Sequence, residues 1–418
     1  METRSIVIIG GGIIGCTTAY YLTNHPDFKK SDTVTVIEAS VHGAAQGASG
    51  KAGGLVAKWA YPKSLVNVSF PEHVRLAEKH NGKERWGWRF VGCGSWEGRG
   101  EIVEAFNEHP SAETRRKSLE KTVGLGEGWR DRKKADTGLP ADLNWVKEEL
   151  TETYSPMAPN GHTAQVHPYL FTTSMLELAK ERGARFVSGK VTTVNIDDAS
   201  RSVSGVTYTD LKTGENTTIS ATHVVLAAGA WSSKILPSLP IHGVRAHSIT
   251  IHPQSSVSIS PYVLFTDISF PRGTPLGSKP ASPEIYARPD NEVYCCGTGD
   301  HWEVPLPETV DEVAVDPAAC ETIWQHVAGI SKELREGKVD KRQACYLPTV
   351  TTASDPSLGG DPIVGEASKV AKNLFIATGH TCWGICNAPG TAKALSELIL
   401  EGKITCGNIK SLSPSRFA

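Results

Sequence analysis

The chain has 418 residues, with 43 Lys and Arg against 45 Asp and Glu, so its formal net charge is −2. This balance argues against nucleic acid or an anionic membrane as a partner, because both require a basic surface. No stretch reaches the ~20 apolar residues of a membrane helix, and no basic leader precedes the apolar residues 6–22, so we expect a cytoplasmic location. The basic runs 115–117 and 130–134 are expected to be solvated surface.

The first 38 residues predict a strand, a turn, a helix and a second strand. Residues 5–9 are β-branched and continuous, as in a buried parallel strand. A glycine turn follows, then a helical pattern over 13–24, and a second strand over 33–37 that ends at Glu38. A small-residue loop occupies 43–54, and a helix is expected over 69–80 with Pro71 near its start. Residues 86–159 are polar and irregular, and short helices are the only elements expected there.

Strands and helices then alternate to the end of the chain. A helix is predicted over 169–182, a meander over 185–194, 203–209 and 216–220 with turns at Gly205 and Gly214, and a buried strand over 223–227. Residues 241–345 are rich in strand signals with one helix over 316–328, and the chain closes with a strand over 374–377 and a helix over 391–400. We therefore predict an α/β protein with a discontinuous Rossmann-like cofactor domain (1–85, 160–240 and 345–410) and a mixed β-sheet substrate domain (86–159 and 241–344).

Residues 10–15 read G-G-G-I-I-G and fit the dinucleotide fingerprint G-x-G-x-x-G. In this motif the first glycine makes the tight turn, the second lets the backbone approach a pyrophosphate, and the third lets the helix pack on the strand. Glu38 ends the second strand, where its carboxylate can accept hydrogen bonds from ribose hydroxyls. The residues expected to contact the cofactor here are Gly10, Gly12, Ile13, Ile14, Gly15, Glu38 and Ala39.

Three further segments favour FAD over NAD as the cofactor. Residues 47–54 form a second glycine-rich loop, residues 223–232 a buried strand with a small-residue turn, and residues 377–380 a strand end before a helix whose dipole could face the flavin ring. The contacts expected from them are Ser49, Lys51, Ala52, Gly53, Gly54, Leu55, Ala228, Gly229, Trp231, Gly379, His380, Thr381, Trp383 and Gly384.

From residue 6 to about 402 the chain resembles the D-amino-acid-oxidase-like family of FAD oxidoreductases, which includes glycine, sarcosine and fructosyl-amine oxidases. Its A-S-G-K-A-G-G segment at 48–54 and its C-Y-L-P at 345–348 are most similar to fungal members. The resemblance implies an FAD-binding domain and a substrate domain over the flavin, with Val191 contacting the adenine region through its backbone. It also implies an enzyme of the EC 1.4 or 1.5 type. Such an enzyme moves a hydride from a carbon bearing an amine to flavin N5, after which the imine hydrolyses and O2 reoxidises the flavin to give H2O2.

The resemblance also implies site residues, and the chain departs from the family at two of them. Glycine-oxidase-like members clamp the substrate carboxylate with an Arg where this chain has Leu347. Lys58 is the replacement favoured here, and the other candidates are Arg245, Arg272 and Arg288. Sarcosine-oxidase-like members place a Lys above the flavin where this chain has Cys295, which predicts slow oxidase activity or an acceptor other than O2.

Other residues are also expected near the flavin, and plainer alternatives stay open for Trp383, for Cys345 and for the pair of Cys295 and Cys296. His380 and Trp383 follow the last strand, and Trp383 either walls the active site or packs in the core. Cys345 lies where some members bond a cysteine to the flavin 8α carbon, and otherwise it is a buried thiol. Cys295 and Cys296 form either a redox pair or, because strand neighbours alternate, two side chains on opposite faces.

The sequence gives no sign of a metal site or a disulfide framework. The nine cysteines form no C-x-x-C pair, and their number is odd. His242, His247 and His252 are five residues apart on a strand-like segment, so neighbouring members would face opposite sides. The predicted partners are a small amine or amino-acid-like substrate and an electron acceptor. Two alternatives remain open: an FAD-dependent 2-hydroxy-acid dehydrogenase, and an FAD-stabilised interaction protein with little turnover.

Overall fold

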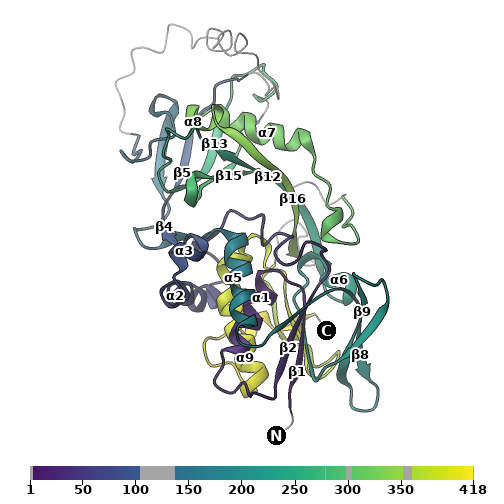
Figure 1. Ribbon diagram of the computed structural model, residues 1–418. Coiled ribbons are helices and arrows are strands. Elements are labelled where there is room, and N and C mark those ends of the chain that lie inside the picture. The colour runs from purple at the N-terminus through teal and green to yellow at the C-terminus, as the bar shows by residue number, and fades with distance from the viewer. Residues whose placement is uncertain (1–2, 104–136, 278, 298–303, 352–359, 418) are drawn as a thin grey trace.

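The computed structural model describes residues 3–103, 137–277, 279–297, 304–351 and 360–417. The two basic runs expected to be solvated surface lie outside this part of the chain. Two large β-sheets organise the described residues, one below the other in the view of Figure 1. Among the described helices, none combines the length and apolar character that a bilayer crossing requires.

The first sheet has eight strands in the order β10-β9-β8-β2-β1-β11-β18-β17. Its five central strands pair in parallel, and among them β1, β2 and β11 have the continuous runs of mostly buried, largely β-branched residues that are typical of such strands. The bounds are β1 Ser5–Ile9, β2 Thr33–Glu38, β8 Arg185–Asp197, β9 Ser202–Asp210, β10 Asn216–Ser220, β11 His223–Leu226, β17 Ile363–Glu366 and β18 Leu374–Thr378.

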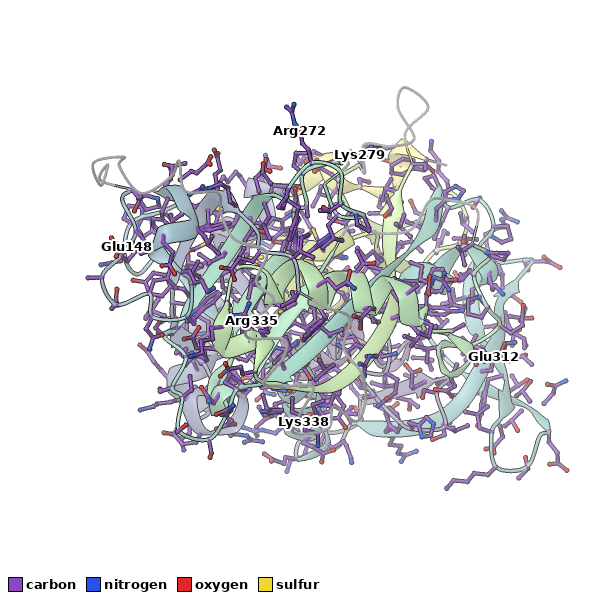
Figure 2. The ribbon with its side chains drawn as sticks, turned by 90° about the horizontal axis from the view of Figure 1, so that it is seen from above. Glu148, Arg272, Lys279, Glu312, Arg335 and Lys338 are labelled. Carbon is purple, nitrogen blue, oxygen red and sulfur yellow. The ribbon has the colours of Figure 1, made fainter. Side chains whose placement is uncertain are left out.

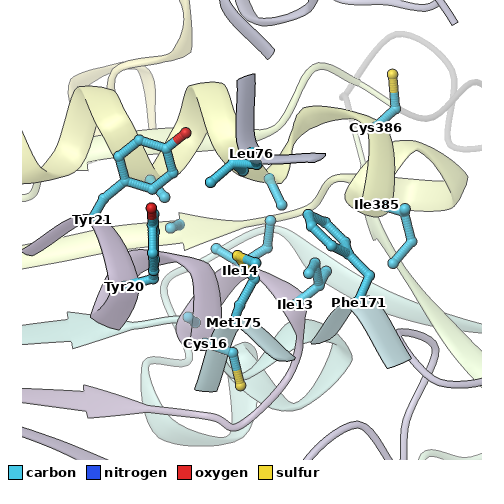
Figure 3. Close-up of a cluster of buried hydrophobic side chains, with 14 of the residues drawn as sticks. Ile13, Ile14, Cys16, Tyr20, Tyr21, Leu76, Phe171, Met175, Ile385 and Cys386 are labelled. Carbon is cyan, nitrogen blue, oxygen red and sulfur yellow. The ribbon is translucent and has the colours of Figure 1, made fainter. Parts of the chain in front are cut away.

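Helices cover one face of this sheet and enclose the largest hydrophobic core (Figures 1 and 3). Helix α1 (Ile13–Thr23) is buried along its whole length, because α5 (Pro168–Lys180) and α9 (Gly384–Glu401) pack against it. Phe171 and Met175 of α5 lie beside Ile13 and Ile14 of α1 in this core. The remaining helices on this side are α2 Lys63–Lys79 and α3 Gly82–Trp86, and α6 Ser232–Ile235 follows β11. The packing fixes the start of α1, which carries the glycine fingerprint.

The second sheet has seven strands in the order β16-β12-β15-β14-β13-β5-β6. Its bounds are β5 Gly92–Arg99, β6 Thr151–Pro156, β12 Ile241–His252, β13 Tyr262–Ser269, β14 Glu284–Ala287, β15 Val293–Cys296 and β16 Lys338–Val350. Helices α7 (Pro317–Ala328) and α8 (Lys332–Arg335) form a second hydrophobic core together with one face of this sheet. A small third sheet contains β3 Leu55–Ala57, β7 Thr163–Gln165 and β4 Arg89–Phe90.

Short 3-10 turns complete the described elements: η2 Glu148–Leu150, η3 Gly229–Trp231, η4 Pro289–Asn291, η5 Val310–Glu312, η6 Thr381–Trp383, η7 Lys410–Leu412 and η8 Pro414–Arg416. Strand β16 runs through residue 345, where the sequence placed a domain boundary. The domain boundary at residue 345 therefore stays a prediction.

The sequence placed two helix starts too late. Helix α2 begins at Lys63, so Pro71 lies inside it, and α9 begins at Gly384, so Pro389 lies inside it. The two helices pack on each other, and the Ser69 hydroxyl accepts a hydrogen bond from the Gly390 amide at 2.9 Å. Such tertiary contacts outweigh the local cost of a proline.

Two other expectations were wrong in detail. Gly205 lies within β9 rather than in a turn, and it pairs with Ser220 of β10. A Cβ at Gly205 would lie 2.3 Å from the Ile219 carbonyl oxygen, so close approach of the strands explains this glycine. The described parts of 86–159 contain strands β4, β5 and β6 as well as the short turn η2. Strand β4 pairs with β7, β5 pairs with β13, and β6 pairs with β5. This pairing stabilises strands that the local sequence pattern does not indicate.

Candidate cofactor and active site

A cavity of about 370 Å³ lies between the carboxyl ends of the first sheet's parallel strands and one face of the second sheet. Ligands of open α/β sheets bind at this edge. The cavity lining includes every residue predicted to contact the cofactor except Gly15. Gly15 lies beneath the turn, where an added Cβ would come 2.0 Å from the Gly10 carbonyl oxygen, as expected for the packing position of the motif.

The glycine turn between β1 and α1 lines the cavity and lies close to neighbouring segments. Gly10 has a φ of 110°, and a Cβ there would lie 2.5 Å from the Ala227 carbonyl oxygen at the end of β11. Gly12 has an ordinary φ of −76°, and a Cβ there would lie 3.1 Å from the Ser49 hydroxyl. The Ile13 amide donates to that hydroxyl at 2.9 Å, which ties the second glycine-rich loop to the start of α1.

Glu38 lies at the end of β2 beside the turn. Its carboxylate accepts hydrogen bonds from the Gly11 amide at 2.6 Å and the Ser40 amide at 2.8 Å. Burial raises the pKa of Glu38, and these two hydrogen bonds oppose that shift. The carboxylate is thus held in place at the cavity wall with lone pairs left for ribose hydroxyls.

These features fit the adenosine diphosphate half of FAD. The first turn of α1 carries no acidic side chain and its N-cap residue is a glycine, so the positive end of the helix dipole faces the cavity beside the Glu38 carboxylate. Val191, at the far side, is 8% exposed and also lines the cavity.

Residues 305–311, which we call the strap, close the same end of the cavity and were missed by the sequence reading. Glu308 pairs with Lys190 at 2.8 Å and with Lys234 at 2.6 Å. Asp311 accepts a hydrogen bond from the Ser40 hydroxyl at 2.6 Å. The Trp231 ring nitrogen donates to the Pro307 carbonyl oxygen at 2.9 Å. Polar contacts between segments far apart in sequence have no local signal.

His380 and Trp383 line the other end of the cavity, after β18. The His380 ring bonds to the Thr391 hydroxyl at 3.0 Å, and burial lowers its pKa to about 3, so it is neutral at physiological pH. Trp383 packs edge-on against Trp59 and Tyr61, with ring centroids 5.7 and 5.3 Å away. The Trp383 ring nitrogen is buried and has no hydrogen-bond partner in the described part of the chain.

Cys345 and Lys51 lie together at the cavity wall. The Lys51 ammonium donates to the Ala344 carbonyl oxygen at 3.0 Å, next to Cys345 in the chain. Burial raises the pKa of the Cys345 thiol to about 11, and the Lys51 charge lowers it in part. A cation therefore stands beside this thiol, but burial keeps the thiol protonated at neutral pH.

One face of the second sheet supplies the opposite wall, and most of its residues were not singled out from sequence. Strand pairing aligns Phe265, Glu284 and Cys296 across β13, β14 and β15. Two residues along, Tyr286 and Tyr294 form the next row. All five side chains line the cavity. The period of two along 284–286 and 294–296 is the signal that could have located them.

Two residues predicted to be catalytic lie away from the cavity. Cys295 is fully buried in the second core, because strand neighbours point to opposite faces and Cys296 takes the cavity face. Its placement does not agree with a role above the flavin. Lys58 is exposed, and its ammonium lies 5.0 Å above the Phe70 ring centroid. Its side chain follows the end of β3 outward instead of lining the site.

The other candidate carboxylate clamps also lie elsewhere. Arg288 is buried under the cavity wall, where it bonds to Glu292 at 2.6 Å and to the Ala52 carbonyl oxygen. Arg245 donates to the Ala314 carbonyl oxygen at 3.3 Å, and Arg272 projects from the outer surface of the molecule (Figure 2). Among the described residues that line the cavity there is no arginine.

The comparisons with known proteins agree with this site. The family model for FAD dependent oxidoreductases (DAO) matches residues 5–398. The Saccharomyces cerevisiae protein named "Putative oxidoreductase TDA3" is 33% identical, over 99% of this chain and 95% of its own length. The Schizosaccharomyces pombe protein named "Putative oxidoreductase C1F5.03c" is also 33% identical, over 99% and 98% of the two chains. The chain therefore belongs to the DAO family of FAD-dependent oxidoreductases.

Solved structures of the same fold include two oxidases. Iminodiacetate oxidase from Chelativorans sp. superposes with a TM-score of 0.68 at 18% identity, covering 98% of both chains. Glycine oxidase from Bacillus cereus superposes with a TM-score of 0.68 at 17% identity, covering 98% of this chain and all of the other. At these identities the likeness shows the fold alone.

Proposed function

We propose that the chain is an FAD-dependent enzyme that oxidises a C–N bond of an amine or amino-acid-like substrate, with O2 as an acceptor that yields H2O2. The proposal rests on the shared cavity. One wall of this cavity is the dinucleotide-binding edge of the first sheet, and the other wall is a group of aromatic side chains together with the Glu284 carboxyl group. FAD, when bound, supplies the acceptor for the hydride that leaves the carbon next to nitrogen.

The residues of this chain would hold and shield the reactants. Gly12, the start of α1 and Glu38 hold the diphosphate and ribose parts of the cofactor. Trp383, Phe265 and Tyr286 give the substrate end an apolar wall, which excludes water and orients the reacting carbon. His380 is neutral and bonded to Thr391, which supports a positioning role for it rather than proton transfer.

The 2-hydroxy-acid alternative has less support. Such a substrate, like an α-amino acid, needs a cation for its carboxylate, whereas Lys190 and Lys234 at the cavity are paired with Glu308, so this argument favours an amine over either acid. Lys51 is the remaining cation among the described lining residues, and it is bonded to the Ala344 carbonyl oxygen.

We also propose that Cys345 carries the flavin covalently. The thiol lines the cavity beside the Lys51 charge, which supports the proposal, while its raised pKa means that only a small fraction is thiolate at any time. The acid-precipitation experiment in the Discussion tests this point separately from the reaction.

The reaction is tested by anaerobic reduction. Purified protein with bound FAD is mixed with a panel of secondary amines, primary amines, amino acids and 2-hydroxy acids, and the oxidised-flavin absorbance is followed. Reduction by members of the amine and amino-acid groups, together with peroxide release in air, supports the proposal. Reduction by hydroxy acids alone would favour the dehydrogenase, and reduction by none would favour an interaction protein.

A further inference from the structure

Glu284 is brought into the cavity by the register of three strands. Residue 284 of β14 pairs with Phe265 of β13 and Cys296 of β15, and all three line the cavity. The next residue, Ile285, points into the second core. The pleat therefore gives Glu284 one orientation, toward the substrate end of the cavity.

The surroundings of Glu284 contain donors but no cation. The Tyr286 hydroxyl donates a short hydrogen bond to its carboxylate, and the Cys296 thiol lies 3.9 Å from the same oxygen. Within the described chain, no Lys, Arg or His forms an ion pair with Glu284. A carboxylate taken out of water without a cation is unfavourable, so in the free protein burial favours its protonated form, and a cationic ligand would favour its ionised form.

The same wall lacks what an amino-acid substrate would need. No arginine lines the described cavity, and Arg288 is engaged by Glu292 at 2.6 Å behind it. Beside Glu284 stand the rings of Phe265 and Tyr286, whose faces attract cations and pack against apolar substituents, while the Arg288 guanidinium already lies 4.7 Å from the Tyr294 ring centroid. Charge and shape at this end therefore complement a cation with an apolar substituent, not a carboxylate.

We propose that Glu284 binds the protonated nitrogen of the substrate, and that the site prefers simple alkyl- or arylamines to amino acids. This inference rests on the proposed function and narrows its substrate class. Binding of the ammonium ion would favour the ionised form of Glu284 and supply the positive charge that the surrounding residues do not. Because hydride leaves only from a carbon next to a neutral nitrogen, the ammonium must lose its proton before oxidation, and the Glu284 carboxylate that binds it is placed to accept that proton.

The interaction has a pH dependence with a definite sign. Burial raises the pKa of Glu284 above its ordinary value, and hydrogen bonds from Tyr286 and Cys296 oppose the shift. The other titratable groups that face it are the thiols of Cys93 and Cys382, whose raised pKa values keep them neutral. Affinity for a cationic amine should therefore fall as the pH drops through the pKa of Glu284.

The test compares ligands that differ only by a carboxylate. Phenethylamine is paired with phenylalanine and dimethylamine with sarcosine, and each dissociation constant is taken from the anaerobic perturbation of the flavin spectrum. We expect the amines to bind at least about tenfold more tightly, and Glu284→Gln to weaken amine binding by about tenfold or more and to remove its acid-side pH dependence. FAD content and melting temperature check that the variant is folded.

Glu97→Gln is the matched control, because Glu97 is exposed on β5 outside the cavity, and it should bind like the wild type. Tighter binding of the amino acids, or an unchanged amine affinity in Glu284→Gln, would overturn the inference and leave the proposed function standing. Failure of every amine and amino acid to perturb or reduce a bound flavin would overturn both.

Discussion

The two walls of the cavity are built in different ways. The cofactor wall consists mainly of backbone and small residues: the first βαβ unit supplies Gly10, Gly12 and Glu38, and the second glycine-rich loop, the turn after β11 and the segment after β18 add to it. The substrate wall consists of large side chains from separate strands, among them Phe265, Glu284 and Tyr294. Backbone groups bind the same cofactor whatever the substrate, so the cofactor wall needs the same sequence motif in every case. Side chains of the substrate wall can be substituted one at a time, and each substitution changes which substrates bind. The predictions below test this contrast.

The largest effect should come from Gly12→Val. The φ of −76° at Gly12 suits any residue, so the fold should survive, but a side chain 3.1 Å from the Ser49 hydroxyl would occupy the space that the pyrophosphate needs. We expect protein that purifies without yellow colour, with a normal circular dichroism spectrum. Gly12→Ala is the smaller step and should retain more FAD. Full FAD occupancy in Gly12→Val would show that the turn does not approach the cofactor.

The second effect concerns Cys345, which joins the two walls because β16 carries it from the second sheet to the cavity. If the flavin is covalently bound, acid precipitation of the wild type should give a yellow pellet, and Cys345→Ser should release the colour to the supernatant. Cys386→Ser serves as the control, because this buried thiol bonds to the Ala57 carbonyl oxygen and does not line the cavity. A white pellet from the wild type would make Cys345 a structural thiol.

The third effect separates two lysines of the same loop region. Lys51 lines the cavity and Lys58 lies outside it above Phe70. Loss of a charge-assisted contact costs about 1.5–3 kcal/mol, so Lys51→Gln should weaken binding of the anionic cofactor by about tenfold or more, whereas Lys58→Gln should change neither FAD affinity nor KM. Titration of apoprotein with FAD measures the first quantity. A selective effect of Lys58→Gln on an anionic substrate would restore the role that the sequence suggested for it.

The smallest effect should come from the strap. Hydrogen bonds and ion pairs with Lys190 and Lys234 lower the pKa of Glu308 to about 2, so the contacts are complete above its ordinary value of 4.5 and are lost as the pH falls through about 2. Because Glu308 is exposed, Glu308→Gln should raise the rate of FAD dissociation only a few-fold at low salt, and high salt should remove the difference. An equal effect at low and high salt would contradict an electrostatic role for these pairs.

The sequence by itself determined the part of the cofactor wall that lies in the first 54 residues, but not the strap. Gly10, Gly12, Ser49 and Glu38 are local features: each follows from a strand end, a turn or a spacing within about 40 residues, and local geometry is what a linear pattern records. For the same reason the last strand, expected over 374–377, was found at Leu374–Thr378, whereas α2 and α9 both begin earlier than expected because their starts depend on tertiary packing.

Only the tertiary structure decided the substrate wall. Cys295 and Cys296 are adjacent, and their assignment to the core and to the cavity depends on the register of β15 between β12 and β14. The role proposed for Glu284 depends on neighbours such as Cys296, which are distant in sequence and close in space. Arg288 is not a candidate carboxylate clamp, because it pairs with Glu292 and donates to the Ala52 carbonyl oxygen. Side-chain contacts between distant segments are set by packing of the whole sheet, and a shift of one residue would reverse every assignment on that face.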